Sequence, residues 1–164
     1  MKRKPARHSD AMQLRPAKLA DVDAIVDLEN ASFSTPHEQF NRRQVRYLIG
    51  SAKAEALVAE LRGQVMGWGV AIRRRLAGGR REIGRIYGLA VHPEGRGMNI
   101  GQALLGRLLN RLSQRGIQRV WLEVRADNIA AIRLYERFGF LADRQLPHYY
   151  RRAMHAIRMV RNID

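Results

Sequence analysis

Residues 92–101 read HPEGRGMNIG, and they separate an apolar run, IYGLAV (86–91), from a leucine-rich run, QALLGRLLNRL (102–112). Three of these ten residues are glycines. A glycine cluster between a strand and a helix lets another group approach the backbone closely. Free N–H groups and the positive end of the helix dipole meet at the first turn of a helix, so an anion is the natural occupant. The stretch therefore predicts an anion site, with Arg96 as a fixed positive charge beside it.

The glycine spacing excludes two common phosphate-binding motifs. A P-loop requires G-x-x-x-x-G-K-[ST], but Gly101 is followed by glutamine and alanine. A dinucleotide fingerprint requires G-x-G-x-x-G, whereas the last interval is one residue longer here. A tight turn without a ligand is the alternative interpretation.

The composition suits one globular domain. The 164 residues are enough to bury a core without disulfides, and 46% of them are hydrophobic. We assign residues 12–164 to this domain and residues 1–11 to a basic mobile arm, because the arm has charge but no apolar segment behind it. The sequence has no cysteine, which excludes disulfides and a cysteine nucleophile. No segment is apolar over the length of a membrane span. Because the sequence shows neither a secretory signal nor a cysteine, we expect a cytoplasmic protein.

The charge of the chain is strongly unbalanced. Thirty Lys and Arg against fifteen Asp and Glu give a net charge of +15. A positive field of this size favours polyanionic partners such as nucleic acid or the ribosome. Solvated arginines on a generally basic surface are the alternative interpretation. Two arginine clusters stand out: Arg73, Arg74, Arg75, Arg80 and Arg81, and Arg144, Arg151, Arg152, Arg158 and Arg161.

Hydrophobic periodicity predicts an α/β domain with a mixed sheet, in the order β-α-α-β-β-β-α-β-α-β-β. One helix joins the strand that ends at Val91 to the strand that begins at Arg119, which implies a parallel, right-handed crossover. The expected strands are 12–18, 56–61, 64–74, one that ends at Val91, 119–125, 146–150 and 155–161. The expected helices are one capped by Asp21, 38–49, one from Ile100 to a stop at Gly116, and one from an Asn128 cap to Gly139.

Two segments resemble a known family. LAVHPEGRGMNIGQALL (89–105) resembles the acyl-CoA-binding motif of the GCN5-related N-acetyltransferases (GNAT), R/Q-x-x-G-x-G/A, with Arg96, Asn99 and Gly101 at the motif positions. Asn99 stands where the family usually has glycine, and asparagine tolerates a positive φ better than most residues. LEVRADNIAAIRLYERFGF (122–140) is similar to the matching segment of bacterial ribosomal-protein alanine acetyltransferases.

The resemblance implies a fold and a cofactor. The fold is a GNAT-type, mostly antiparallel mixed sheet, in which the two strands of the parallel crossover splay apart. Acetyl-CoA, the acyl donor, would lie with its pantetheine between these strands and its pyrophosphate on the glycine turn. By resemblance, the cofactor-binding residues are Leu89, Ala90, Val91, Arg96, Gly97, Met98, Asn99, Ile100, Gly101, Asn128 and Tyr135.

The resemblance also assigns two catalytic roles. Glu123 would be the general base, through a water molecule, and Tyr135 would be the general acid that protonates the departing thiolate. An ion pair of Glu123 with Arg125 or Arg133 on a solvated face is the alternative for the first residue, and a place in the core is the alternative for the second. Histone-type members place their base glutamate where Arg85 stands here.

Other residues could contact the acceptor. His37 and Glu38 fall in a loop that borders the acceptor site in this family, and the tail 147–159 would form another wall. The five histidines show no metal-ligand spacing, so no metal is predicted.

We therefore expect an N-acetyltransferase that moves an acetyl group to a primary amine by direct attack, with the N-terminal α-amino group of a protein or peptide as acceptor. The alternatives are another amine, carried by a small molecule or an aminoacyl-tRNA, and a non-catalytic acyl-CoA-binding module. Expected partners include a ribosome or RNA at the basic surface but no membrane, and the chain would be a monomer or homodimer.

Overall fold

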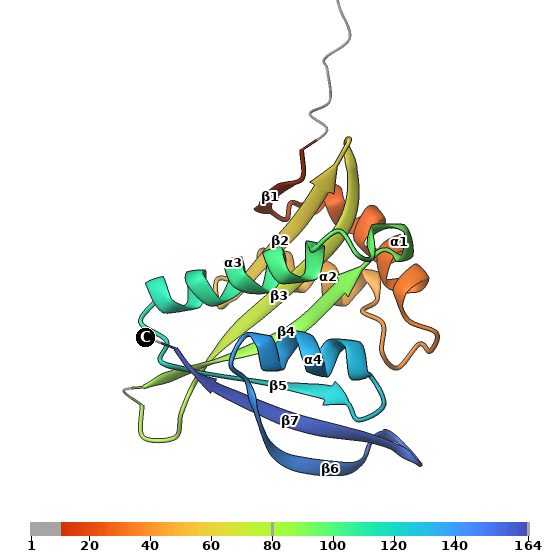
Figure 1. The fold of residues 1–164 in the computed structure, drawn as a ribbon. Helices are drawn as coiled ribbons and strands as arrows, with labels where there is room; N and C mark the ends of the chain where they lie inside the picture. Colours follow the sequence, from red (N-terminus) through yellow and green to blue (C-terminus); the bar gives the residue numbers. More distant parts are fainter. Residues whose placement is uncertain (1–10, 80, 164) are drawn as a thin grey trace, which may run out of the picture.

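The computed structural model describes residues 11–79 and 81–163, so Arg80, Asp164 and nearly all of the predicted arm lie outside the described residues. The described chain forms a seven-stranded sheet in the order β1-β2-β3-β4-β5-β7-β6 (Figure 1). The strands are β1 Gln13–Pro16, β2 Ala54–Leu61, β3 Gln64–Arg75, β4 Glu82–Val91, β5 Arg119–Arg125, β6 Leu141–Arg151 and β7 Met154–Asn162. The helices are α1 Val22–Ser32, α2 Arg42–Gly50, α3 Ile100–Gln114 and α4 Ile129–Arg137, with short 3-10 turns η1 Leu19–Asp21 and η2 Pro93–Gly95.

The predicted mixed sheet and its parallel crossover are confirmed. Among the described strands, β4 and β5 form the parallel pair, and the other neighbours run antiparallel. The β4–β5 ladder contains two residue pairs, Gly84 with Val120 and Arg85 with Trp121. Beyond them the two strands separate, as Figure 1 shows between the arrowheads of β4 and β5. The wedge between them opens toward the end of the sheet where the glycine turn lies.

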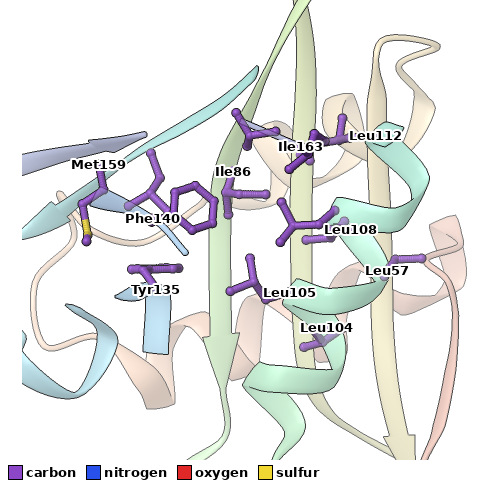
Figure 2. Packing of buried hydrophobic residues seen from close by; sticks show 14 of the residues in the cluster. Leu57, Ile86, Leu104, Leu105, Leu108, Leu112, Tyr135, Phe140, Met159 and Ile163 are labelled. Carbon is purple, nitrogen blue, oxygen red and sulfur yellow. The ribbon is translucent and has the colours of Figure 1, made fainter. Parts of the chain in front are cut away.

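Both faces of the sheet are covered by helices. Leu57 and Ala59 of β2 belong to the core under α3, whereas Val58 between them belongs to the core under α1 and α2. This alternation places the two cores on opposite faces. The leucines of α3 follow the predicted apolar stripe and are buried over β2, β3 and β4 (Figure 2). Each buried leucine contributes about 2 kcal/mol of hydrophobic free energy, so this stripe fixes α3 and, with it, the position of the glycine turn.

The second helix begins later than the sequence predicted, and the reason is local. It starts at Arg42 and not at residue 38. The side chain of Asn41 accepts a hydrogen bond from the Gln44 N–H at 2.9 Å, and the Gln44 side chain accepts one from the Asn41 N–H at 2.9 Å. This capping box ends the preceding loop. Residues 33–40 are therefore free to line the site.

Two further expectations were wrong in detail. Asp21 precedes α1 but does not cap it through its side chain, because its carboxylate accepts hydrogen bonds from Arg15 and from the Lys18 N–H. The sixth strand begins at Leu141, five residues before the predicted start at 146. It is an edge strand paired with β7 alone, so its polar residues are exposed and lack the alternation that marks a strand.

Candidate active site

The free edge of β4 forms the first part of the site. Leu89, Ala90 and Val91, which the resemblance assigned to the cofactor, lie on β4 beyond the end of the β4–β5 ladder. Their backbone pairs with β3 on one side, and no β5 residue pairs with them on the other. An extended ligand with amide groups could occupy the wedge as an additional strand would.

The glycine turn forms the second part of the site. Gly97 has φ 79° and Asn99 has φ 58°, so the backbone is left-handed at both positions. Asparagine therefore holds the conformation for which the family motif uses glycine. In the described part of the chain, the N–H groups of Gly97, Asn99 and Ile100 have no backbone partner, and Arg96 has no carboxylate within 4 Å. These free donors at the N-terminus of α3 fit a pyrophosphate.

Gly95 has a different role from the one that the glycine cluster predicts. Gly95 is buried, and a Cβ placed on it would lie 2.9 Å from Cδ1 of Ile100. A Cβ on Gly67 of β3 would lie 2.6 Å from Cγ2 of the same residue. These two glycines therefore make room for Ile100, which anchors the start of α3.

Glu123 lies on β5 between two arginines. Its side chain is only 4% exposed. Arg85 of β4 contacts its Oε2 at 2.8 Å, and Arg158 of β7 donates to its Oε1 at 3.0 Å. Both guanidinium groups also stack over the ring of Trp121, at 4.7 and 4.5 Å from its centroid. The alternative role predicted for Glu123, an ion pair, is present. Its partners are Arg85 and Arg158 and not Arg125 or Arg133, and the side chain is buried and not on a solvated face. Arg125 pairs instead with Glu38 and Asp127.

Tyr135 occupies a core position that also borders the hollow. It projects from α4, is 8% exposed, and packs edge-on against Phe140 with 5.9 Å between the ring centroids (Figure 2). It also lines the same hollow as Glu123. Burial, and then the neighbouring Tyr150, raise the pKa of its phenol well above the usual value. The hydroxyl group therefore keeps its proton at neutral pH and is available as a donor.

The hollow measures about 540 Å³ and is walled by segments that lie far apart in the sequence. The side chain of Asn128 caps α4 by accepting from the Ala131 N–H at 3.1 Å, as predicted, and the residue also lines the hollow. The full lining comprises Glu29, Phe33, His37, Glu38, Gln39, Phe40, Gln44, Arg85, Ile86, Tyr87, Gly88, Leu89, Glu123, Val124, Arg125, Asn128, Ala131, Tyr135, Tyr149 and Tyr150.

Ion pairs and hydrogen bonds fasten the loop after α1 to the rest of the hollow. Arg125 donates to Glu38 at 2.9 Å, and Thr35 donates to the other oxygen of Glu38 at 2.6 Å. Elsewhere in the lining, Arg85 donates to the Tyr149 hydroxyl at 3.2 Å. Burial, and then Tyr149, raise the pKa of Tyr150 to about 12. His37 and Glu38, suggested for acceptor contact, line this hollow, whereas Tyr149 and Tyr150 are the members of the tail 147–159 that do so.

Glu29 is a residue of the site that the sequence analysis missed. Its carboxylate is fully buried and accepts hydrogen bonds from Trp68 Nε1 at 2.6 Å and from the Phe40 N–H at 3.1 Å. Burial raises its pKa to about 7, although both hydrogen bonds oppose this shift. Glu29 follows Val22 and Ile25 at helical spacing, so it occupies a core position of α1. A carboxylate at a core position was the available signal.

The described residues hold no group of three or more His, Asp or Glu that is arranged to bind a metal ion. The same part of the chain contains no helix of the length and hydropathy needed to cross a membrane.

Comparisons with known proteins agree with this geometry. The sequence profile of the acetyltransferase (GNAT) family matches residues 22–140. The [ribosomal protein bS18]-alanine N-acetyltransferase of Escherichia coli is 47% identical over 55 residues, which is 34% of this chain and 37% of that protein. The chain thus spans little more than a third of the first curated relatives it matches. An N-alpha-acetyltransferase of Sulfurisphaera tokodaii is 30% identical over 88% of this chain and 89% of its own length.

Solved structures show the same fold. The crystal structure of the ribosomal-protein-S18-alanine N-acetyltransferase from Escherichia coli matches with a TM-score of 0.80 at 24% identity, over 94% of this chain and 95% of that chain. A protein of Salmonella typhimurium, solved with its cofactor acetyl-CoA, matches with a TM-score of 0.75 at 26% identity, over 94% of this chain and 95% of that chain. Acetyl-CoA is the acyl donor in this family. The chain belongs to the GNAT family of acetyltransferases.

Proposed function

We propose that this protein transfers the acetyl group of acetyl-CoA to the N-terminal α-amino group of a protein or peptide. The amine attacks the thioester carbonyl directly, a C–N bond forms, the C–S bond breaks and coenzyme A leaves. One proton leaves the amine and one is taken up by the thiolate. The observation that carries the proposal is that buried Glu123 and buried Tyr135, on different elements, line the same hollow at the mouth of the β4–β5 wedge.

The donor side of the site is made mainly of backbone groups. Acetyl-CoA supplies the activated acetyl group when it is bound. The free edge of β4, at Leu89 to Val91, would hold the pantetheine amides, and N–H groups of this edge could also stabilise the oxyanion. The turn from Arg96 to Gly101 would hold the pyrophosphate. Asn128 would contact the cofactor near the pantetheine while it caps α4.

Two side chains would move the protons. Glu123 would accept the proton of the attacking amine through a water molecule, and its two arginine partners hold both of its oxygens in place. Tyr135 would donate its phenolic proton to the departing thiolate. The phenol is protonated at neutral pH, as a general acid must be. The two groups thus act on opposite ends of the same tetrahedral intermediate.

The choice of acceptor is supported by the relatives and by charge. The named relatives acetylate the alanine of a ribosomal protein or carry the name N-alpha-acetyltransferase. A chain with a net charge of +15 repels polyamines and other small polycations. We therefore favour a peptide α-amine. We also propose that the acceptor is presented in the cytoplasm on a ribosome or another RNA-containing particle, to a monomer or homodimer of this chain.

Two matched peptides test this acceptor assignment. One begins with a free alanine α-amine and contains no lysine, and the other has a blocked N-terminus and one internal lysine. We expect acetylation of the first peptide alone when mass spectrometry follows the products with acetyl-CoA present. Acetylation of the lysine peptide, or of spermine, in preference to the first peptide would contradict the assignment. Binding of acetyl-CoA without turnover of any amine would favour the non-catalytic alternative.

A further inference from the structure

A group of arginines lies away from the active site. The active-site hollow is lined by Glu29, Glu38 and Glu123 against two arginines, Arg85 and Arg125. Two neighbouring hollows lie at the other end of the sheet, where β4 and β5 begin and α3 ends, and they share Arg115. We call their arginines the arginine rim, which consists of Arg75, Arg81, Arg107, Arg111, Arg115 and Arg119. Two glutamates, Glu55 and Glu82, lie among them.

The glutamates of this region are already shared between arginines. Glu55 is 8% exposed at its side chain and accepts from Arg111 at 3.1 Å and from Arg115 at 3.2 Å. Glu82 contacts Arg73 at 3.3 Å and Arg75 at 3.8 Å. Each carboxylate thus pairs with two guanidinium groups, so one negative charge faces two positive charges at each glutamate.

Three arginines of the rim have no carboxylate partner at all within the described residues. They are Arg81, Arg107 and Arg119, and all three are exposed. Unpaired exposed arginines in a group repel one another, and nothing in the fold requires them at these positions. A surplus of positive charge favours a polyanionic ligand.

The arrangement fits a nucleic-acid backbone better than an acidic protein or a membrane. Arg107 and Arg111 of α3 and Arg115 at its C-cap follow one another at four-residue intervals, which corresponds to a rise of about 6 Å from one to the next. The amides of Asn110, Gln114 and Gln118 lie among the arginines, and such groups bind phosphate and sugar oxygens. Leu76 is the one large exposed hydrophobic residue of the described lining, whereas protein interfaces and membrane-binding surfaces need apolar anchors.

We propose that the arginine rim is a docking site for nucleic acid, which it binds through the sugar–phosphate backbone. Along α3 the rim begins at Arg107, about 10 Å from the start of the helix, and ends at Arg115, about 22 Å from it. No arginine of the rim lines the active-site hollow, so nucleic acid on the rim would leave that hollow open. The enzyme could be held on an RNA-containing particle while a chain terminus enters the active site. The docking itself does not depend on the proposed acetyl transfer.

A matched pair of double variants tests the proposal by fluorescence anisotropy. Arg107→Glu with Arg119→Glu alters the rim, and Arg43→Glu with Arg46→Glu makes the same change of net charge on α2, where both residues are exposed. We expect a short RNA duplex to bind the wild-type protein with a steep salt dependence between about 50 and 200 mM. The rim variant should lose at least about tenfold in affinity, and its salt slope should fall by about one per lost phosphate contact. The α2 variant should keep most of the affinity.

Two further probes, a DNA duplex and a polyglutamate peptide, distinguish RNA from DNA and nucleic acid from an acidic protein. A DNA duplex that binds as tightly as RNA supports a backbone site of either kind, and tighter binding of RNA supports one that reads the 2′-hydroxyl groups. Equal loss in the two double variants would overturn the proposal, because it would mean that net charge alone drives binding. Tighter binding of a polyglutamate peptide than of either duplex would also overturn it in favour of an acidic protein. Acetylation of a short peptide should be unchanged in the rim variant.

Discussion

The donor side and the acceptor side of the hollow are built in different ways. The donor side comes from one stretch, residues 86–140, and consists mainly of backbone groups at a strand edge and a helix start. The acceptor side joins α1, the loop after it and β6 through side chains such as Glu38, paired with Arg125, and Tyr149, bonded to Arg85. A binding surface made of backbone groups tolerates changes of side chain, whereas a network of side chains is sensitive to the substitution of each member. Substitutions on the two sides should therefore affect different kinetic constants.

The largest effect is expected where the two sides meet, at Glu123. Glu123→Gln keeps the shape of the side chain, removes the proton acceptor and leaves one of the two guanidinium groups without its acceptor. The value of kcat should fall by about 10²–10⁴-fold while the Kd for acetyl-CoA stays the same. Steady-state kinetics and calorimetric titration measure the two quantities. Glu136→Gln, at an exposed position of α4, is the control. An unchanged kcat in Glu123→Gln would mean that Glu123 is not the general base.

Tyr135→Phe should have the next largest effect. The ring keeps its packing against Phe140, so the melting temperature should change little, while the loss of the proton donor should lower kcat by about 10- to 100-fold. Tyr47→Phe is the control, because Tyr47 is 72% exposed. If kcat persists and only the melting temperature falls, Tyr135 is a core residue without a catalytic role.

A backbone change should affect the donor side alone. Asn99→Val places a β-branched residue at φ 58°, which costs about 1–2 kcal/mol in the left-handed region. The Kd for acetyl-CoA should rise by about tenfold, and the KM for the peptide should hardly change. Asn99→Gly, which relieves the strain, should bind acetyl-CoA at least as tightly as the wild type. Equal affinity of the two variants in calorimetry would mean that the turn does not hold the cofactor.

The smallest kinetic effect should come from Glu29, on the acceptor side. Glu29→Gln has one oxygen for two donors, so either Trp68 or the Phe40 N–H loses its partner and the loop next to the hollow loosens. The peptide KM should rise by about threefold to tenfold, which corresponds to about 1 kcal/mol, with the Kd for acetyl-CoA unchanged. A change in the Kd for acetyl-CoA alone would contradict this placement.

Glu29 also predicts how stability depends on pH. Its pKa is raised to about 7 in the folded state from an ordinary value of 4.5, so the folded protein binds this proton more tightly than the unfolded chain. The contribution of Glu29 to the free energy of unfolding should therefore be fully present below about pH 4.5 and should be lost as the pH rises from there through about 7. Urea denaturation of the wild type and Glu29→Gln at several pH values measures the difference. An identical pH dependence in both proteins would contradict the assignment.

The elements of the donor side could be predicted because their signals are local. The leucine stripe of α3, the alternation of β5 and the left-handed tolerance of Asn99 each lie within one element or turn. The cap at Asn41 was also local, but the helix start was nevertheless placed too early, at residue 38.

Contacts between residues of distant elements could not be predicted in the same way. Arg85 and Arg158 reach Glu123 from 38 and 35 residues away in the sequence, and only the sheet order brings the three together. The packing role of Gly95 depends equally on the position of Ile100 in the folded chain. Periodicity specifies elements, whereas contacts between distant elements follow from the topology.

The central claim is that the acetyl group passes directly from the thioester to an amine within one hollow. Initial rates measured while acetyl-CoA and an alanine-terminated peptide are varied together test this claim most directly. Direct transfer requires both substrates to be bound at once, so we expect double-reciprocal lines that intersect. Parallel lines, the mark of a covalent acetyl-enzyme that forms before the peptide binds, would contradict the account.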